Sequence, residues 1–145
     1  MDRKVVGAVA AAVALVAGGC GSTAKPLSRA EFVARAEAAC RQATQVVNAR
    51  TSRPTRGIEG FIERLVAGLK VESDAFNKLT PPKDMQSTFT AYKQDLTQFS
   101  DLAKRFSAAA KARDRKQMET INRQATPMTT RRAAHIRALG LRACT

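Results

Sequence analysis

The sequence contains very few of the residues that build active sites or metal centres. It has no tryptophan, one tyrosine, one histidine and three cysteines in 145 residues. A zinc site needs three or four ligands, usually His and Cys, and His135 is the only histidine. We find no serine-nucleophile elbow, no glycine-rich phosphate loop and no Cys-x-x-Cys pair. We therefore predict a protein that is not an enzyme, with no catalytic residue, no cofactor and no bound metal.

Five polar residues are candidates for chemistry. His135 falls at the edge of an apolar stripe, so we interpret it as half-buried or exposed and not as a general base. Glu59 and Glu63 are four residues apart, as in di-metal sites, but no Glu-x-x-His accompanies them. Glu72 is the polar residue closest to its stripe, and Glu72 and Asp74 do not share one helical face.

Glycine and proline are sparse inside the long segments, and aromatic residues make up only 5% of the chain. The apolar residues are mainly Ala, Leu, Ile, Val, Phe and Met, a composition that favours helices over strands. Apolar residues recur at spacings of three and four in four segments, which indicates four amphipathic helices. These segments run over residues 28–50, 58–79, 85–106 and 114–140.

The ends of the predicted helices carry capping and stop signals. Ser28-Arg29-Ala30-Glu31 has the pattern of a capping box, and Asp114 can cap the fourth helix. Thr80-Pro81-Pro82 stops the second helix, because proline lacks the backbone donor and disfavours helical geometry in the residue before it. Gly140 fits the left-handed position just after a helix end.

Four amphipathic helices joined by short loops predict an all-α fold, an antiparallel four-helix bundle. Pro127 lies inside the fourth helix and should kink it; a break into two shorter helices near Thr126 is the alternative. In such a bundle the end of the fourth helix returns to the first.

The first twenty residues have the layout of a secretory signal. An apolar run over 5–17 follows a charged start and precedes Gly18-Gly19-Cys20. Residues 16–20 resemble a bacterial lipobox, although Ala17 stands where Leu is commonest. The resemblance implies a lipoprotein signal peptide over 1–19 and a diacylglycerol on Cys20. A flexible tether over 20–27 and a bundle domain over 28–145 would then follow, anchored to the cell membrane on its extracytoplasmic side.

Two alternatives to lipidation remain open at this point. An ordinary signal peptide cut near Gly19 would leave Cys20 as a free thiol. An uncleaved membrane anchor is less favoured, because the apolar run falls short of the roughly 20 residues that a spanning helix needs.

Cys40 and Cys144 form an even pair once Cys20 is assigned to a lipid. Export to an oxidising compartment allows disulfides, so we predict a Cys40–Cys144 bond that closes a loop of about 100 residues. Two buried free thiols are the alternative.

Several of these features together resemble a family. The lipobox, the segment from Glu31-Phe32 to Ala39-Cys40, the Pro81-Pro82 break and residues 138–144 are similar to small helical lipoproteins of actinobacteria. Most such proteins have no assigned activity. The resemblance implies a location and a fold, and almost nothing about function.

Basic charge is the strongest remaining feature. The formal net charge is +13, and nine Lys or Arg lie between residue 111 and the end, against two acidic residues. Two interpretations stay open: a solvated face that only aids solubility, and a contact with anionic membrane lipids or wall polymers. Nucleic acid fits the charge but not the predicted location. The predicted contact residues are Lys111, Arg113, Arg115, Lys116, Arg123, Arg131, Arg132 and Arg137.

These observations lead to a non-enzymatic interaction or accessory module of the cell envelope, with an unknown protein partner. The alternative is a carrier of a small apolar ligand or lipid, since an Ala- and Met-rich core leaves room and adapts. A void in the core would separate the two hypotheses. Five phenylalanines are expected to fill the core, which favours the first hypothesis: Phe61, Phe76, Phe89, Phe99 and Phe106.

Overall fold

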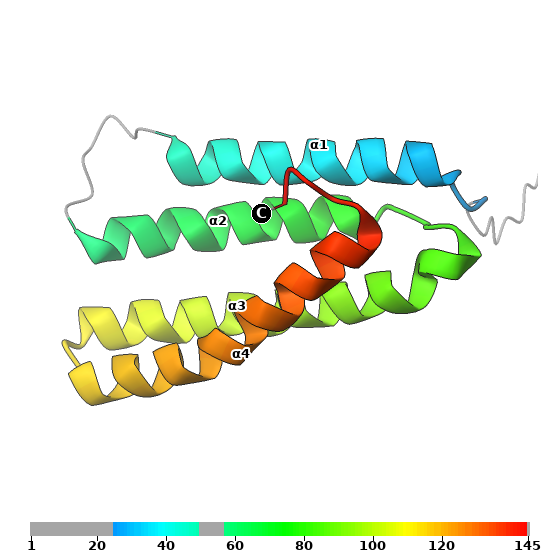
Figure 1. Cartoon of the computed structure of the whole chain (residues 1–145). Helices are drawn as coiled ribbons and strands as arrows, with labels where there is room; N and C mark the ends of the chain where they lie inside the picture. The colour runs from blue at the N-terminus through cyan, green and yellow to red at the C-terminus, as the bar shows by residue number, and fades with distance from the viewer. Residues whose placement is uncertain (1–24, 50–56, 145) are drawn as a thin grey trace, which may run out of the picture.

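The computed structural model describes residues 25–49 and 57–144. They form four α-helices and one short 3-10 turn: α1 Arg29–Asn48, α2 Ile58–Phe76, η1 Lys83–Met85, α3 Gln86–Lys111 and α4 Arg115–Leu139. The helices pack in chain order, α1 on α2, α2 on α3 and α3 on α4, and successive helices run antiparallel (Figure 1). No strand occurs among the described residues. The predicted all-α bundle is confirmed.

The capping box predicted at the start of α1 is present. The Glu31 backbone N–H donates to Ser28 Oγ at 3.3 Å, and the Ser28 backbone N–H donates to Glu31 Oε2 at 2.9 Å. Hydrogen bonds from the Ser28 side chain and backbone lower the pKa of Glu31. The bundle also includes Leu27 from the predicted tether, since its N–H donates to the Thr80 carbonyl at 2.9 Å and its side chain packs on the core.

Both predicted caps of α4 are also confirmed. Asp114 Oδ1 accepts the backbone N–H of Gln117 at 2.9 Å. Gly140 follows the last residue of α4 and adopts a left-handed conformation with φ 72°. The N–H of Leu141 donates to the Ile136 carbonyl at 3.0 Å. This turn buries Leu141 and directs the chain back towards α1 (Figure 1).

α4 continues through Pro127, so the alternative of two shorter helices is wrong. Figure 1 shows the first part of α4 beside α3 and its later part turning away towards α1. Proline removes one helical hydrogen bond, and threonine hydroxyls nearby bond to backbone carbonyls, which also bends helices. Thr126 Oγ1 donates to the Asn122 carbonyl at 3.1 Å and Thr129 Oγ1 to the Thr126 carbonyl at 2.7 Å.

α1 and α2 approach closely at Gly68, which is buried. A Cβ on this residue would lie 2.6 Å from Val47 Cγ2 and 2.9 Å from the carbonyl oxygen of Ala43. Neither distance is compatible with a side chain, so glycine allows the two backbones to meet. Arg64 adds a hydrogen bond across the same pair of helices, from its Nε to the Val47 carbonyl at 3.0 Å.

The core consists of two clusters. The larger unites α1, α2, α3 and the end of α4 around Phe32 and Phe89, whose rings meet edge to face at 5.0 Å. The smaller lies between α3 and α4 around Leu102 and Ile121. No helix of the described residues is long and apolar enough to cross a membrane.

The five phenylalanines expected to fill the core divide into three groups. Phe76 and Phe89 are buried, as predicted. Phe99 and Phe106 are partly buried and pack against the smaller cluster. Phe61 is 46% exposed, so the prediction that it fills the core is wrong. It falls on the outer side of α2, one position before the buried Ile62.

Candidate functional site

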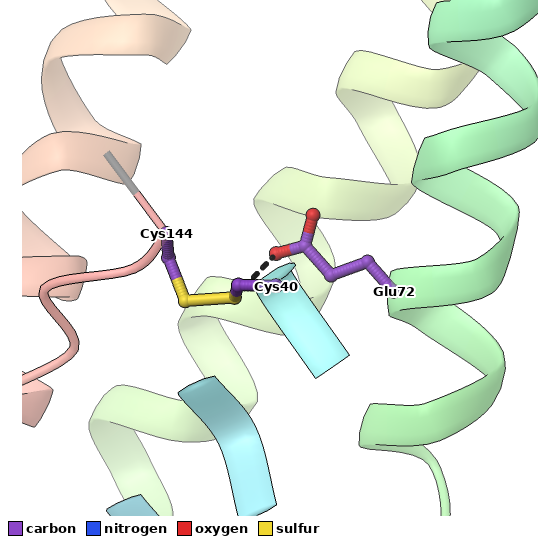
Figure 2. Close-up of side chains that lie close together, drawn as sticks. All are labelled: Cys40, Glu72 and Cys144. Atoms are coloured by element: carbon purple, nitrogen blue, oxygen red, sulfur yellow. Dashed lines mark hydrogen bonds between the residues drawn. A yellow bond between two sulfur atoms is a disulfide. The ribbon is translucent and has the colours of Figure 1, made fainter. Parts of the chain in front are cut away.

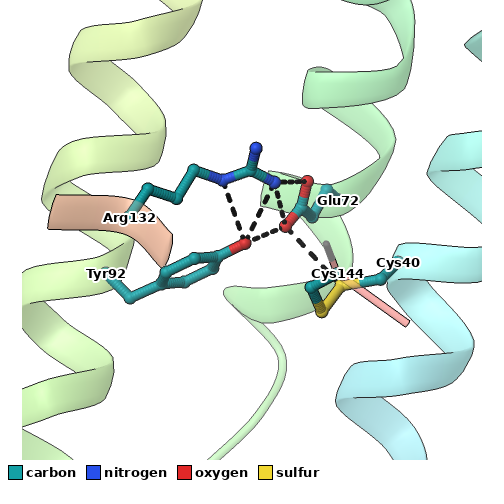
Figure 3. A network of polar contacts seen from close by, with 5 residues as sticks. All are labelled: Cys40, Glu72, Tyr92, Arg132 and Cys144. Carbon is teal, nitrogen blue, oxygen red and sulfur yellow. Dashed lines mark hydrogen bonds and ion pairs between the residues drawn. A yellow bond between two sulfur atoms is a disulfide. The ribbon is translucent and has the colours of Figure 1, made fainter. Parts of the chain in front are cut away.

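The most distinctive site is a buried polar cluster formed by one residue from each of α2, α3 and α4. Glu72 is 3% exposed and Tyr92 is fully buried. Arg132 extends from the later part of α4 to meet them, and its side chain is 22% exposed (Figure 3). Glu72 and Tyr92 lie on the apolar faces of α2 and α3. When these faces pack into the core, both polar side chains are buried with them.

The three side chains form hydrogen bonds with one another. Arg132 Nη2 donates to Glu72 Oε2 at 3.1 Å and to Oε1 at 3.2 Å. The same guanidinium donates to the Tyr92 hydroxyl oxygen, from Nε at 3.3 Å and from Nη2 at 3.2 Å. The Tyr92 hydroxyl in turn donates to Glu72 Oε1. The Arg132 guanidinium also lies over the Tyr92 ring, 5.7 Å from its centroid.

Burial and charge fix the protonation of this cluster. Burial and then the negative charge of Glu72 raise the pKa of Tyr92 above its usual value. Burial opposes the charge on Arg132, but Glu72 and Tyr92 outweigh it and raise the pKa of Arg132. The phenol therefore stays protonated and the guanidinium stays charged. Tyr92 and Arg132 thus lack the near-neutral pKa of an efficient proton-transfer catalyst.

The Cys40–Cys144 disulfide lies directly beside this cluster, and the predicted pairing is confirmed. Glu72 Oε1 is 3.7 Å from Cys40 Sγ, a contact drawn in Figure 2. Both cysteines are buried, at 2% and 7% exposure. The backbone N–H of Arg142 donates to Glu37 Oε1 at 2.9 Å, and this bond lowers the pKa of Glu37. The C-terminal segment is thereby attached to α1 twice.

Cys40, Glu72 and Cys144 place one ligand atom each within 4.8 Å of one another. Metal binding requires thiolates, and here the two sulfurs are bonded to each other. Glu72 already accepts from Tyr92 and Arg132, and the Arg132 charge repels a cation. In this oxidised form the cluster is a closed structural unit and not a metal centre.

A second polar group adjoins the first, one turn further along α3. Asp95 is 6% exposed and accepts from Arg131 Nη2 at 2.9 Å and from Arg131 Nε at 3.3 Å. His135 Nε2 lies 3.4 Å from the other carboxylate oxygen of Asp95. The His135 side chain is 27% exposed, so the predicted half-buried position is correct. The pair Arg131 and Arg132 thus anchors α4 to two buried acids.

The predicted basic contact residues separate into inward and outward groups. Arg132 belongs to the buried cluster, so its inclusion in an exposed basic surface was wrong. Arg131 pairs with Asp95 and Lys111 with Glu63 at 3.1 Å, yet both cations remain more than half exposed. The others are exposed and have no carboxylate partner among the described residues: Arg113, Arg115, Lys116, Arg123 and Arg137.

Four of these cations gather where α3 turns into α4, and we call this group the basic turn: Lys111, Arg113, Arg115 and Lys116. It lies at the end of the bundle opposite the start of α1 (Figure 1). Arg113 adopts φ 56°, which reverses the chain between the two helices and brings the cations before and after it together.

Sequence reasoning missed both buried acid–arginine groups. Glu72 lies beside its apolar stripe, and its place between Leu69 and Phe76 is the available signal of burial. Asp95 was overlooked although it sits between the buried Tyr92 and Leu96. No feature of the sequence alone pairs these acids with Arg131 and Arg132, because the pairing depends on where α4 crosses the other helices of the bundle.

No family model matches the chain, and no curated protein or solved structure shows significant similarity to it. Sequence and structure together define a small all-helical protein with one disulfide among the described residues.

Proposed function

We propose that this chain is a lipoprotein, anchored through Cys20 to the extracytoplasmic face of the cell membrane and related to the small helical lipoproteins of actinobacteria. It acts there as a non-enzymatic interaction module that binds anionic polymers of the envelope. Residues 1–24, including the signal peptide, Cys20 and most of the tether, lie outside the described residues. The lipobox supports the anchor.

The position of the basic turn carries the proposal of a polymer ligand. The tether precedes α1, whereas the basic turn lies at the opposite end of the bundle (Figure 1). α3 has 26 residues and therefore spans about 39 Å between these ends. A bundle standing on its tether presents the basic turn away from the membrane. Polymers that carry phosphate or uronate groups outside the membrane match this charge.

The buried polar clusters support a binding protein over an enzyme. Glu72, Tyr92 and Arg132 satisfy one another, and the disulfide beside them is buried. An active site needs polar groups that converge on space for a substrate. The exposed cations supply charge for binding and no nucleophile or base.

The anchor is tested by the intact mass of the protein purified from membranes. We expect a chain that begins at Cys20, carries a diacylglycerol and gains two hydrogens on reduction. The Cys20→Ser variant is expected to move to the soluble fraction, with Ser22→Ala as the control that stays on the membrane. A mass that retains residues 1–19 without lipid would remove the anchor.

The ligand is tested with the full chain in membranes and purified anionic wall polymer. Replacing Arg113, Arg115 and Lys116 together by Gln is expected to weaken binding at least tenfold and to lower its salt dependence. The matched control changes three exposed cations elsewhere, Arg35, Lys78 and Lys83, to Gln. Equal losses in the two triple variants would show that only net charge matters. Binding to anionic vesicles but not to polymer would replace the proposed ligand with a membrane surface.

A further inference from the structure

An apolar groove opens at the end of the bundle where α2 begins. It lies between the first turns of α2, the second half of α3 and the first half of α4, and its volume is about 180 Å³. Its walls are almost entirely apolar, with Ile62 and Leu65 from α2, Phe99 and Phe106 from α3, and Ile121 and Ala125 from α4. An apolar cavity of about 150 Å³ stays dry and binds a benzene-sized ligand, so a groove of this size suits an apolar group.

The groove continues into a second hollow whose lining is different. Both spaces are lined by Ile58, Phe106 and Asn122, and Arg115 and Glu119 add charged groups to the second one. Ile58 at the junction is 56% exposed, the most exposed large hydrophobic residue that the structure describes. The two spaces together present an apolar floor and a wider mouth, which is still mostly apolar but carries the charged side chains of Arg115 and Glu119.

The charged side chains at the mouth of the groove indicate which kind of polar group could bind there. Arg115 is exposed in the first turn of α4 and makes no ion pair with a described carboxylate. Glu119 opposes an anion at the same mouth, and Asp114 is a second acid next to Arg115 in the sequence. Arg113 and Lys116 add positive charge on either side of Arg115. Three cations thus face two acids over residues 113–119, and this positive excess favours an anion.

We propose that this groove binds a single-chain amphiphile with an anionic head, of the fatty-acid type. The acyl chain occupies the floor between Phe99, Phe106 and Ile121, and the carboxylate meets Arg115 at the mouth. The floor of this site is distinct from the polymer-binding surface, because its side chains carry no charge, whereas Arg115 belongs to both.

Photolabelling of the full chain in the membranes of the expressing cells tests the proposal. The probe is dodecanoate that carries a diazirine near its methyl end. We expect labelled peptides from residues 58–65, 99–106 and 121–125, and competition by unlabelled dodecanoate. Dodecanol is expected to compete about tenfold less well, since it cannot form a charge-assisted bond to Arg115.

Two pairs of variants make the test specific. Ala125→Leu fills the floor and should lower labelling about tenfold, while Ala134→Leu on the exposed side of the same helix should leave it unchanged. Arg115→Gln should weaken competition by dodecanoate about tenfold, and Lys78→Gln, a change at an exposed cation that lines neither space, should not. An intact disulfide and unchanged helical circular dichroism show that each variant is folded.

Three results would overturn the proposal. Labels spread evenly over exposed peptides would show nonspecific partition. Equal labelling of the Ala125→Leu and Ala134→Leu variants would place the ligand elsewhere. A dimer of the full chain in which Ile58 and Phe106 are protected, with no dodecanoate incorporated, would assign the groove to a second copy. Ala125→Leu changes no charge, so its effect is distinguishable from a failure of polymer binding.

Discussion

Arg132 on α4 binds both carboxylate oxygens of Glu72 on α2, although the two residues are 60 positions apart in the sequence. Each helix packs mainly on its neighbour in the chain, and α2 and α4 do not pack along their lengths. The ion pair therefore joins the later part of α4 directly to α2. Buried ion pairs are weak sources of stability but costly to break on one side.

The Glu72→Gln variant is expected to lower the free energy of unfolding by about 3 kcal/mol, because it leaves the Arg132 charge partly buried without its counter-ion. Denaturant unfolding followed by circular dichroism measures the change. Asp74→Asn is the matched control on the same helix, since Asp74 forms an exposed pair with Lys70. It should cost less than about 0.5 kcal/mol.

A double variant separates the ion pair from other effects of the substitution. Glu72→Gln combined with Arg132→Gln should be less destabilised than the sum of the single variants, with a coupling of about 1–3 kcal/mol. Additive effects would show that Glu72 and Arg132 contribute independently and that the ion pair does not position α4.

The disulfide is expected to stabilise the bundle through loop closure. Cys40 and Cys144 are 104 residues apart, and the chain-entropy model assigns about 4–5 kcal/mol to a loop of this length. The Cys40→Ser variant should therefore melt roughly 10–20 °C lower than the native chain under oxidising conditions. If the variant melts at the same temperature as the native chain, the Arg142–Glu37 hydrogen bond and the packing of Leu141 hold the C-terminal segment without the disulfide.

Gly68→Ala should destabilise the protein even though alanine is the better helix former by about 1 kcal/mol. The added methyl would lie 2.9 Å from the backbone oxygen of Ala43, which cannot move without shifting α1. Overpacking of this kind costs about 1–3 kcal/mol. Thermal melting measures the net effect, and an exposed Ala67→Gly change reports the helix propensity alone. A more stable Gly68→Ala variant would show that α1 and α2 separate at little cost.

The helices and the disulfide could be predicted from the sequence because their signals are local or have few alternatives. The capping box at Ser28 and Glu31, the proline break and the left-handed Gly140 each act within a few residues. The disulfide followed from assigning Cys20 to lipid, which left two cysteines.

The packing between helices could not be predicted in the same way. The exposed Phe61 and the inward Arg132 depend on the rotation of α2 and the crossing of α4. Apolar spacing gives the buried face of a helix only approximately. It does not show which neighbouring helix contacts the edge of that face. The position of the apolar groove beside Ile58 could therefore not be predicted.

Tyr92 is the only tyrosine in the chain, so its titration can be observed directly. Burial and the charge of Glu72 raise its pKa above the ordinary value of 10.0. A raised pKa means that the folded state holds the phenol proton more tightly than the unfolded state. The stability from this group is fully present below pH 10.0 and is lost as pH rises above that value.

The absorbance of tyrosinate should therefore rise only together with the loss of helical circular dichroism, at a pH above 10.0. Tyr92→Phe removes the hydroxyl bonds to Glu72 and Arg132 and should cost about 1 kcal/mol at neutral pH. Its stability should then fall less steeply in alkali than that of the native chain. Tyrosinate that forms near pH 10.0 in a chain that keeps its helical signal would mean that the hydroxyl reaches solvent, contrary to a closed Glu72–Tyr92–Arg132 cluster.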